Sequence, residues 1–299
     1  MRSLIVGLSL AALLVAACGG GGGGAKPAVI VGSTNFYEQT ILGEVYAQIL
    51  EANGYTVTRK FNLGAREIVQ PALQSGQIDV LAEYLATLVA FLDKTAKPTT
   101  DKTETAKVLQ GLLTPKNLTV LDPADATDQN GIVVTKDTAA KYSLKKISDL
   151  APVAKDLVFG GPPECPQRPF CALGLKDTYG ITFKDFKPLD VGGPLTVAAL
   201  EGKQIDVALL FTSDPSIVAK GFVLLEDDKH LQLADNIAPV VRNDLLAKDT
   251  SGDVKKLLNQ VSAKLSQAEL NGMNTEVSVN KKDPKDVAGA WLKKQGLIK

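Results

Sequence analysis

Histidine, cysteine and aromatic residues are scarce in this sequence. The 299 residues include one histidine, three cysteines and one tryptophan, and aromatic residues make up 5% of the chain. His230 lies in the segment DDKHLQ, which is typical of a solvated loop, and the neighbouring Asp227 and Asp228 would diverge on a strand. No Gly-x-Ser-x-Gly, His-Glu-x-x-His or Cys/His pairing is present. We therefore expect neither an enzyme nor a cofactor or metal.

An excess of positive charge is also lacking. The 33 basic residues equal the 33 acidic residues, and no basic stripe is present, which makes nucleic acid an unfavourable partner. The apolar and charged fractions, 45% and 22%, are ordinary for a globular protein. From about Ala25 onward the chain is long enough for two α/β lobes.

No hydrophobic run is long enough for a comfortable membrane span. The run LIVGLSLAALLVAAC after Arg2 has the form of a secretory signal, which we assign to residues 1–17. Its end, VAAC, resembles the lipobox of bacterial lipoproteins, in which the cysteine, here Cys18, is lipidated. Residues 18–27 would then form a glycine-rich tether, because Gly19 to Gly24 cannot hold a fixed conformation. The alternative is an ordinary signal peptide with a chance cysteine.

The other two cysteines, Cys165 and Cys171, lie in the segment CPQRPFC. Because disulfides persist in exported proteins, we predict a bond that closes a short proline-rich loop. Two free thiols are the alternative. A metal site is disfavoured because no histidine or second cysteine pair lies nearby.

Hydrophobic periodicity predicts alternating strands and helices. This order implies an α/β fold with mostly parallel sheets and helices on both faces. We expect strands at 28–33, 55–61, 78–84, 131–135, 156–161, 205–211, 222–227 and 237–242, and helices near 38–54, before Leu73, and at 145–151, 193–204, 251–274 and 284–296.

One phrase occurs twice. ALQSGQIDVLAEYLAT (72–87) and ALEGKQIDVALLFTSD (199–214) align so that Tyr84 corresponds to Phe211. Duplication of a helix–turn–strand unit in two lobes explains this; the alternative is favourable turn-to-strand chemistry and a chance match. The repeated Asp79 and Asp206 then have turn or capping roles. In open parallel sheets ligands bind beyond the carboxyl ends of strands, where Tyr84 and Phe211 lie, and an aromatic face suits a diffuse cation.

Longer segments carry a family resemblance. VGSTNFYEQTILGEVYAQILE, REIVQPALQSGQIDVLAEYLAT, FGGPPECPQRPFCALGLKDTYGI and NIAPVVRNDLL together resemble the glycine betaine/choline (osmoprotectant) substrate-binding proteins of ABC transporters. The resemblance implies a type 2 periplasmic-binding-protein fold, in which two lobes joined by two crossing hinge strands close on a ligand. Lobe 1 would comprise 28–130 and 238–299, and lobe 2 131–237, with the crossings near GIVV and APVV.

The resemblance also implies ligand contacts. Tyr84 and Phe211 would be walls of an aromatic cage for a quaternary ammonium, and Arg168 would hold the ligand carboxylate with Thr87 as a hydroxyl donor. The family pattern is incomplete, because a lysine is replaced by Thr34 and two cage tyrosines by Asn130 and by Asp235 or Asn236. Asp235 could compensate by pairing with a cation. We take Asn35, Asn130 and Asp235 as further candidate contacts.

Structural alternatives remain for these residues. Tyr84 and Phe211 could be core residues, and Arg168 could pair with Glu164 instead of a ligand. Thr87 and Asn35 could be helix N-caps, and an N-cap at the cleft could present free amides to an anion.

The resemblance implies an extracytoplasmic, monomeric binding protein that is held at the membrane by its lipid and delivers a small solute to an ABC permease with a cytoplasmic ATPase. Two other interpretations are the same scaffold binding an amino acid or polyol, and a sensor or adhesion lipoprotein whose cleft is filled by side chains.

Overall fold

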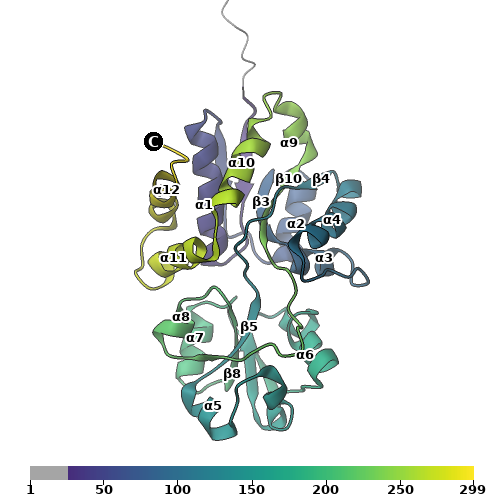
Figure 1. The fold of residues 1–299 in the computed structure, drawn as a ribbon, viewed down its shortest axis with the longest axis vertical. Coiled ribbons are helices and arrows are strands. Elements are labelled where there is room, and N and C mark those ends of the chain that lie inside the picture. The colour runs from purple at the N-terminus through teal and green to yellow at the C-terminus, as the bar shows by residue number, and fades with distance from the viewer. Residues whose placement is uncertain (1–25) are drawn as a thin grey trace, which may run out of the picture.

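The computed structural model describes residues 26–299 as two lobes, one above the other in Figure 1. Each lobe is built around a five-stranded sheet flanked by helices. The signal peptide predicted for residues 1–17, Cys18 and most of the predicted tether lie outside the described residues. In the part that is described, no helix is long and apolar enough to cross a membrane.

The first sheet has the strand order β2-β1-β3-β10-β4. β1 runs parallel to β2 and β3, whereas β10 runs antiparallel to both β3 and β4. The expected mostly parallel sheet is therefore mixed, because β10 enters this sheet from the other lobe. Its strands are β1 (Val29–Gly32), β2 (Val57–Lys60), β3 (Val80–Tyr84), β4 (Leu118–Val120) and β10 (Ile237–Arg242).

The second sheet repeats this arrangement in the order β7-β6-β8-β5-β9. β6 is parallel to β7 and β8, and β5, which enters from the first lobe, is antiparallel to β8 and β9. The strands are β5 (Asn130–Val134), β6 (Val158–Gly161), β7 (Asp185–Pro188), β8 (Val207–Phe211) and β9 (Val223–Leu224).

Alternation of side chains along the strands gives the first lobe a core on each face of its sheet. Val80 and Ala82 of β3 face a cluster with α1, α10, α11 and α12, whereas Leu81 faces a cluster with α2, α3 and α4. The helices of this lobe are α1 (Tyr37–Ala52), α2 (Arg66–Gln74), α3 (Leu85–Leu92), α4 (Lys102–Leu113), α9 (Asn243–Lys248), α10 (Asp253–Lys264), α11 (Gln267–Ser278) and α12 (Pro284–Lys294).

The second lobe has smaller cores and shorter helices. Val207 and Leu209 of β8 face one cluster, and Ala208 and Leu210 face the other. The segment 145–151, expected to be a short helix, contains a 3₁₀ helix at Ile147–Leu150. The α-helices of this lobe are α5 (Lys136–Tyr142), α6 (Ala172–Tyr179), α7 (Pro194–Glu201) and α8 (Ser216–Ala219).

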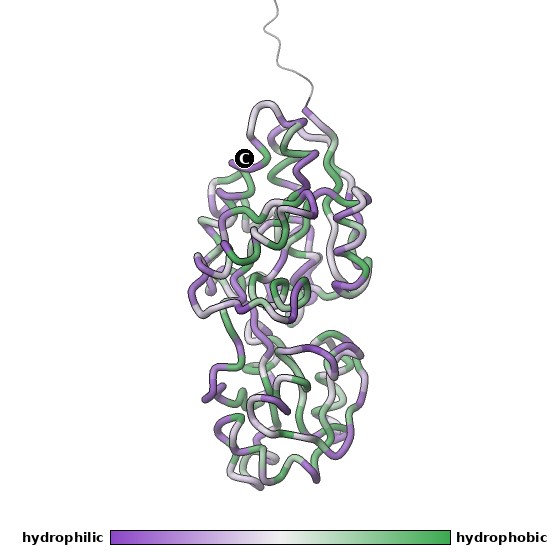
Figure 2. Tube along the Cα trace, turned by 90° about the vertical axis from the view of Figure 1, so that its right-hand side faces the viewer, coloured by the Kyte–Doolittle hydropathy of each residue, from purple (hydrophilic) through white to green (hydrophobic). Residues whose placement is uncertain are grey.

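Two chain segments connect the lobes, one leading into β5 and one leading into β10 (Figures 1 and 2). They run antiparallel and contact each other through a bridge between Thr127 and Asn236. The Asp128 amide donates to the Asp235 carbonyl at 3.1 Å, and the Ile237 amide donates to the Ala126 carbonyl at 3.1 Å. The crossing segments therefore form one hydrogen-bonded hinge.

The repeated phrase has the same structural role in both lobes. The Asp79 carboxylate accepts a hydrogen bond from the Ile30 amide, and the Asp206 carboxylate accepts one from the Val158 amide, each at 2.9 Å. Asp79 thereby links the start of β3 to β1, and Asp206 links the start of β8 to β6. The pair is therefore architectural, as predicted, but each carboxylate links two strands and does not act as a turn or capping residue.

The predicted disulfide between Cys165 and Cys171 is also present, with the two Cα atoms 5.3 Å apart. It closes a loop of the second lobe that includes the 3₁₀ helix Cys165–Gln167 and Arg168. The loop lies at the junction of the two lobes, which places Arg168 beside the first lobe.

Candidate functional site

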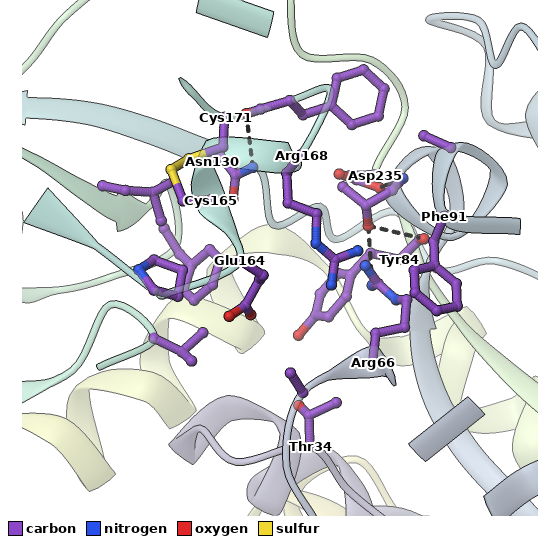
Figure 3. A pocket seen from close by; sticks show the side chains of 18 of the residues that line it. Thr34, Arg66, Tyr84, Phe91, Asn130, Glu164, Cys165, Arg168, Cys171 and Asp235 are labelled. Atoms are coloured by element: carbon purple, nitrogen blue, oxygen red, sulfur yellow. Dashed lines mark hydrogen bonds between the residues drawn. A yellow bond between two sulfur atoms is a disulfide. The ribbon is translucent and has the colours of Figure 1, made fainter. Parts of the chain in front are cut away.

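A cavity of about 340 Å³ lies between the lobes. The carboxyl ends of β3 and β8 reach it from opposite sides, and the disulfide loop forms part of its wall. Figure 3 shows Arg168 pointing into this cavity towards Tyr84 and Arg66. All seven residues predicted as ligand contacts line the cavity: Asn35, Tyr84, Thr87, Asn130, Arg168, Phe211 and Asp235.

Aromatic rings from both lobes meet in this cavity. Phe36, which directly precedes α1, lies with its ring centroid 6.2 Å from that of Tyr84 and 4.9 Å from that of Phe211. Phe91 and Phe170 add two further rings to the wall. Phenylalanines thus supply aromatic rings to this cavity, whereas the family resemblance implies tyrosines at Asn130 and at Asp235 or Asn236.

Tyr84 is both a core residue and a cavity residue. Its side chain is 7% exposed and belongs to the hydrophobic cluster around α1, yet its ring lines the cavity. Its hydroxyl donates a 2.6 Å hydrogen bond to the buried Glu38. Burial raises the pKa of Tyr84 well above its usual value, and the Glu38 carboxyl adds to this shift. Phe211, by contrast, is only half-buried.

Arg168 pairs with the other lobe rather than with Glu164 of its own loop. Its Nη2 donates to both carboxylate oxygens of Glu67, at 2.8 and 2.9 Å, and its guanidinium lies 5.3 Å from the centre of the Phe91 ring. Burial, followed by repulsion from Arg66, lowers the pKa of Arg168. Guanidinium geometry suits a carboxylate, and here a carboxylate of the protein occupies it.

A second arginine, Arg66, is held in the wall of the first lobe. It forms a buried ion pair with Glu83, with Nη2 and Oε2 2.8 Å apart, and donates to the Thr87 hydroxyl at 3.1 Å. The Gln70 amide also donates to Glu83 at 2.7 Å. The charged groups of this wall are therefore fixed relative to one another before any ligand arrives.

The N-terminus of α3 offers no free amides. Thr87 lies inside the first turn, since Tyr84 is the N-cap residue. The amides of Leu85 and Ala86 donate to carbonyls of the crossing segment, and the Thr87 amide donates to Asp235 at 2.8 Å. The N-cap alternative for Thr87, and anion binding by free amides there, are therefore wrong.

Asp235 is buried behind this turn, and its carboxylate accepts from the Thr87 amide. Burial raises its pKa to about 7, against the opposing effects of the Thr87 hydrogen bonds and the charge of Arg66. Burial therefore favours the protonated form of this carboxyl more strongly than in an exposed aspartate.

The two predicted asparagines occupy different settings. Asn130 is the first residue of β5, faces Phe211 in the sheet, and donates to the Phe170 carbonyl at 2.9 Å. Asn35 is exposed at the cavity rim, and the N-cap of α1 is Phe36, so the N-cap alternative for Asn35 is wrong.

Two buried carboxyls, Glu38 and Asp128, lie beneath the aromatic rings. Glu38 accepts from the Ser213 hydroxyl at 2.8 Å and the Asn274 amide at 2.6 Å, and Asp128 accepts from the Ser213 amide at 3.1 Å. Burial raises the pKa of both carboxyls, and for Asp128 the neighbouring Glu38 raises it further. Asp128 lines the cavity, and its buried Oδ2 has no hydrogen-bond partner among the described residues.

Sequence reasoning missed Phe36, Phe91, Arg66 and Asp128. Phe36 had a usable signal, because it follows the first strand at the same sheet edge as Tyr84. Phe91 had none, because the helix that carries it was not predicted. Arg66 and Asp128 could not be recognised from local sequence, because long-range contacts bring them to the cavity. Arg66 of α2 pairs with Glu83 of β3, and Asp128 pairs with the other crossing segment.

Two α/β lobes joined by two crossing segments, with a cavity between them, define a type 2 periplasmic-binding-protein fold. The profile described as "Substrate binding domain of ABC-type glycine betaine transport system" matches residues 27–294, so the chain belongs to this family.

Solved structures of similar proteins agree with this assignment. A glycine betaine/carnitine/choline ABC transporter is 28% identical with a TM-score of 0.70, covering 90% of this chain and 99% of that one. The apo form of YehZ from Escherichia coli is 26% identical with a TM-score of 0.63, over 90% and 99% of the two chains.

Curated relatives point the same way. The glycine-betaine-binding protein of Pseudomonas aeruginosa is 26% identical over 90% of this chain and 88% of its own length. The carnitine transport binding protein OpuCC of Listeria monocytogenes is 28% identical over 91% and 88%. The ergothioneine transport permease/binding protein EgtU of Helicobacter pylori is 27% identical over 91% of this chain, which spans about half of that relative (48%). The family is a transport family rather than an enzyme family.

Proposed function

We propose that this protein is the solute-capturing component of an ABC importer and that it takes up a small osmoprotectant of the glycine betaine/choline type. One observation carries the proposal: a cavity between two hinged lobes is lined by aromatic rings from both. A cation with diffuse charge is attracted to such faces, each desolvated contact contributing about 2 kcal/mol. The relatives' names place quaternary amines among the solutes of this family.

The seven predicted residues act together in this proposal. Tyr84 and Phe211, with Phe36, form the aromatic walls, and Arg168 and Thr87 receive a carboxylate where the ligand has one. Asn35, Asn130 and Asp235 supply polar contacts. Because these groups come from both lobes, a ligand that touches all of them stabilises the closed state over the open state.

Delivery requires partners outside this chain. A permease with a cytoplasmic ATPase accepts the solute, and a lipid on Cys18 keeps the monomeric binding protein at the outer face of the cell membrane. The predicted signal peptide and lipobox support this location.

Calorimetric titration with glycine betaine, choline, carnitine, proline betaine, amino acids and polyols tests the proposal. We expect saturable one-site binding of at least one quaternary amine, with the ligand recovered unchanged and a smaller radius of gyration by solution scattering. Binding of only amino acids or polyols, or no compaction with any bound solute, would contradict it. The plugged cleft expected for a sensor or adhesion protein is not favoured by the open cavity.

Arg168→Ala tests the carboxylate contact. We expect it to abolish measurable binding of glycine betaine while leaving the circular dichroism spectrum intact. Unchanged glycine betaine affinity in this variant would refute the role of Arg168.

A further inference from the structure

The ion pair between Arg168 and Glu67 is unusual in its position. Among residues 26–299 it is the one ion pair that connects the two lobes, because the other salt bridges lie within a lobe or its crossing segment. Arg168 extends from the disulfide loop, and Glu67 is the second residue of α2 in the other lobe. Both residues line the cavity.

The contact joins a carboxylate to one nitrogen of the Arg168 guanidinium. One guanidinium nitrogen of Arg168 lies 2.8 and 2.9 Å from the two Glu67 oxygens, while the Phe91 ring supports the guanidinium from another direction. The Arg168 side chain is 20% exposed and that of Glu67 is 50% exposed. Glu67 can therefore swing into solvent at little cost, whereas Arg168 is held in the wall.

The rest of the cavity offers little to replace Arg168 as a partner for an anion. Arg66 is already paired with the buried Glu83, and Lys94 lies at the exposed rim. Gln39 Oε1, a buried side-chain oxygen of the described wall that has no hydrogen-bond partner, is an acceptor. Acceptors favour a cation or a hydroxyl donor and disfavour a carboxylate.

We propose that Glu67 occupies the carboxylate position on Arg168 and is a specificity-determining residue: it competes with ligands that carry a carboxylate and leaves carboxylate-free cations unaffected. The inference rests on the proposed function, since it assumes a quaternary amine in this cavity. A carboxylated ligand that bonds to Arg168 Nη2 must displace Glu67 from that nitrogen. A cation such as choline needs no such displacement, so the protein favours it over glycine betaine.

Glu67→Gln tests the proposal by removing the competing charge from an exposed side chain whose loss leaves the cores intact. Titration calorimetry at low, fixed salt measures choline and glycine betaine against the wild-type protein and the variant. We expect glycine betaine affinity to rise about fivefold in Glu67→Gln, which is the upper range for a partly exposed ion pair, while choline affinity changes less than about twofold.

Glu164→Gln is the matched control. Glu164 lines the same cavity and lies close enough to influence Arg168, but it accepts no hydrogen bond from that guanidinium among the described contacts. Removing its charge should raise glycine betaine affinity less than about twofold. An equal gain in both variants would assign the effect to general charge and overturn the competition.

The remaining outcomes separate this inference from the proposed function. Glycine betaine affinity that is unchanged or lower in Glu67→Gln, or a parallel rise for choline, overturns the role of Glu67 while the transport proposal stands. If neither quaternary amine binds the wild-type protein or the variant, the proposed function fails and the inference falls with it.

Discussion

The two lobes have the same backbone arrangement around the repeated phrase. In the first, Ile78 packs against Gly32 of β1, where an added Cβ would lie 2.5 Å from Ile78 Cδ1. In the second, Ile205 packs against Gly160 of β6, where the same distance is 2.6 Å. With the matching hydrogen bonds of Asp79 and Asp206, this correspondence supports an internal duplication.

Beyond the strand ends the lobes differ. The first lobe buries Tyr84 and joins its hydroxyl to Glu38, and it holds the Arg66–Glu83 pair in its wall. The second lobe presents a half-buried Phe211 and the disulfide loop. The repeat therefore determines the backbone, while the cavity is asymmetric: its first side has a buried tyrosine and an arginine–glutamate pair, and its second has a half-buried phenylalanine and the disulfide loop. Four predictions test this contrast.

The largest effect is expected at the paired strand ends. Tyr84→Ala should lower the free energy of unfolding by about 4 kcal/mol, because it removes a buried ring and the hydrogen bond that Glu38 Oε1 accepts from Tyr84. Phe211→Ala should lower it by about 1 kcal/mol, since that ring is partly solvated, but should weaken choline binding at least tenfold. Urea unfolding measures the stability losses, and titration calorimetry measures choline binding. Equal stability losses would remove the proposed asymmetry.

The next prediction concerns the buried carboxyl group of Asp235. Burial raises the pKa of Asp235 to about 7, so the folded state keeps a proton that the unfolded state loses from about pH 4 upward. Folding is therefore penalised progressively between pH 4 and 7 and constantly above pH 7. Asp235→Asn should match the wild-type protein near pH 4 and be more stable by about 4 kcal/mol at pH 8. Unfolding curves across this pH range test it; a difference independent of pH would contradict the burial effect.

A smaller difference in stability is expected between variants of the two repeated aspartates. Asp79 also accepts from Arg242 at 3.1 Å, whereas Asp206 has no ion pair among the described residues. Asp79→Ala should lower the free energy of unfolding by about 2 kcal/mol, because it leaves a half-buried arginine without this partner, and Asp206→Ala by about 1 kcal/mol. Thermal unfolding of both variants gives the comparison. A larger loss for Asp206→Ala would reverse the assignment.

The smallest difference is expected at the matched glycines. Gly32→Ala and Gly160→Ala each push a Cβ against the flexible end of an isoleucine, so each should lower the free energy of unfolding by about 1 kcal/mol. The two values should agree within about 0.5 kcal/mol, as measured by denaturant titration. A wide difference would mean that the two sites are not structurally equivalent.

The sequence allowed the repeat, the disulfide and all strands except β4 and β7 to be predicted, because these depend on local periodicity and spacing. It also placed Tyr84 and Phe211 at strand ends, where the cavity forms. It did not predict α4, α5, α6, α8 or α9. It also missed α3, whose sequence LATLVAFL has one polar residue, too few to mark one face. The partner of Arg168 was also missed, because Glu67 is 101 residues away and only the closeness of the lobes brings it near.

The path of the chain through the two sheets has a consequence for the order of folding. Every strand of the second sheet comes from one continuous stretch, residues 130–224, so that lobe can assemble as soon as this stretch has emerged. In the first sheet β4 pairs only with β10, which begins at Ile237, so β4 has no neighbour until the second lobe has been synthesised. The lobe that begins first is therefore completed last, and a chain truncated before Ile237 would leave an open sheet edge.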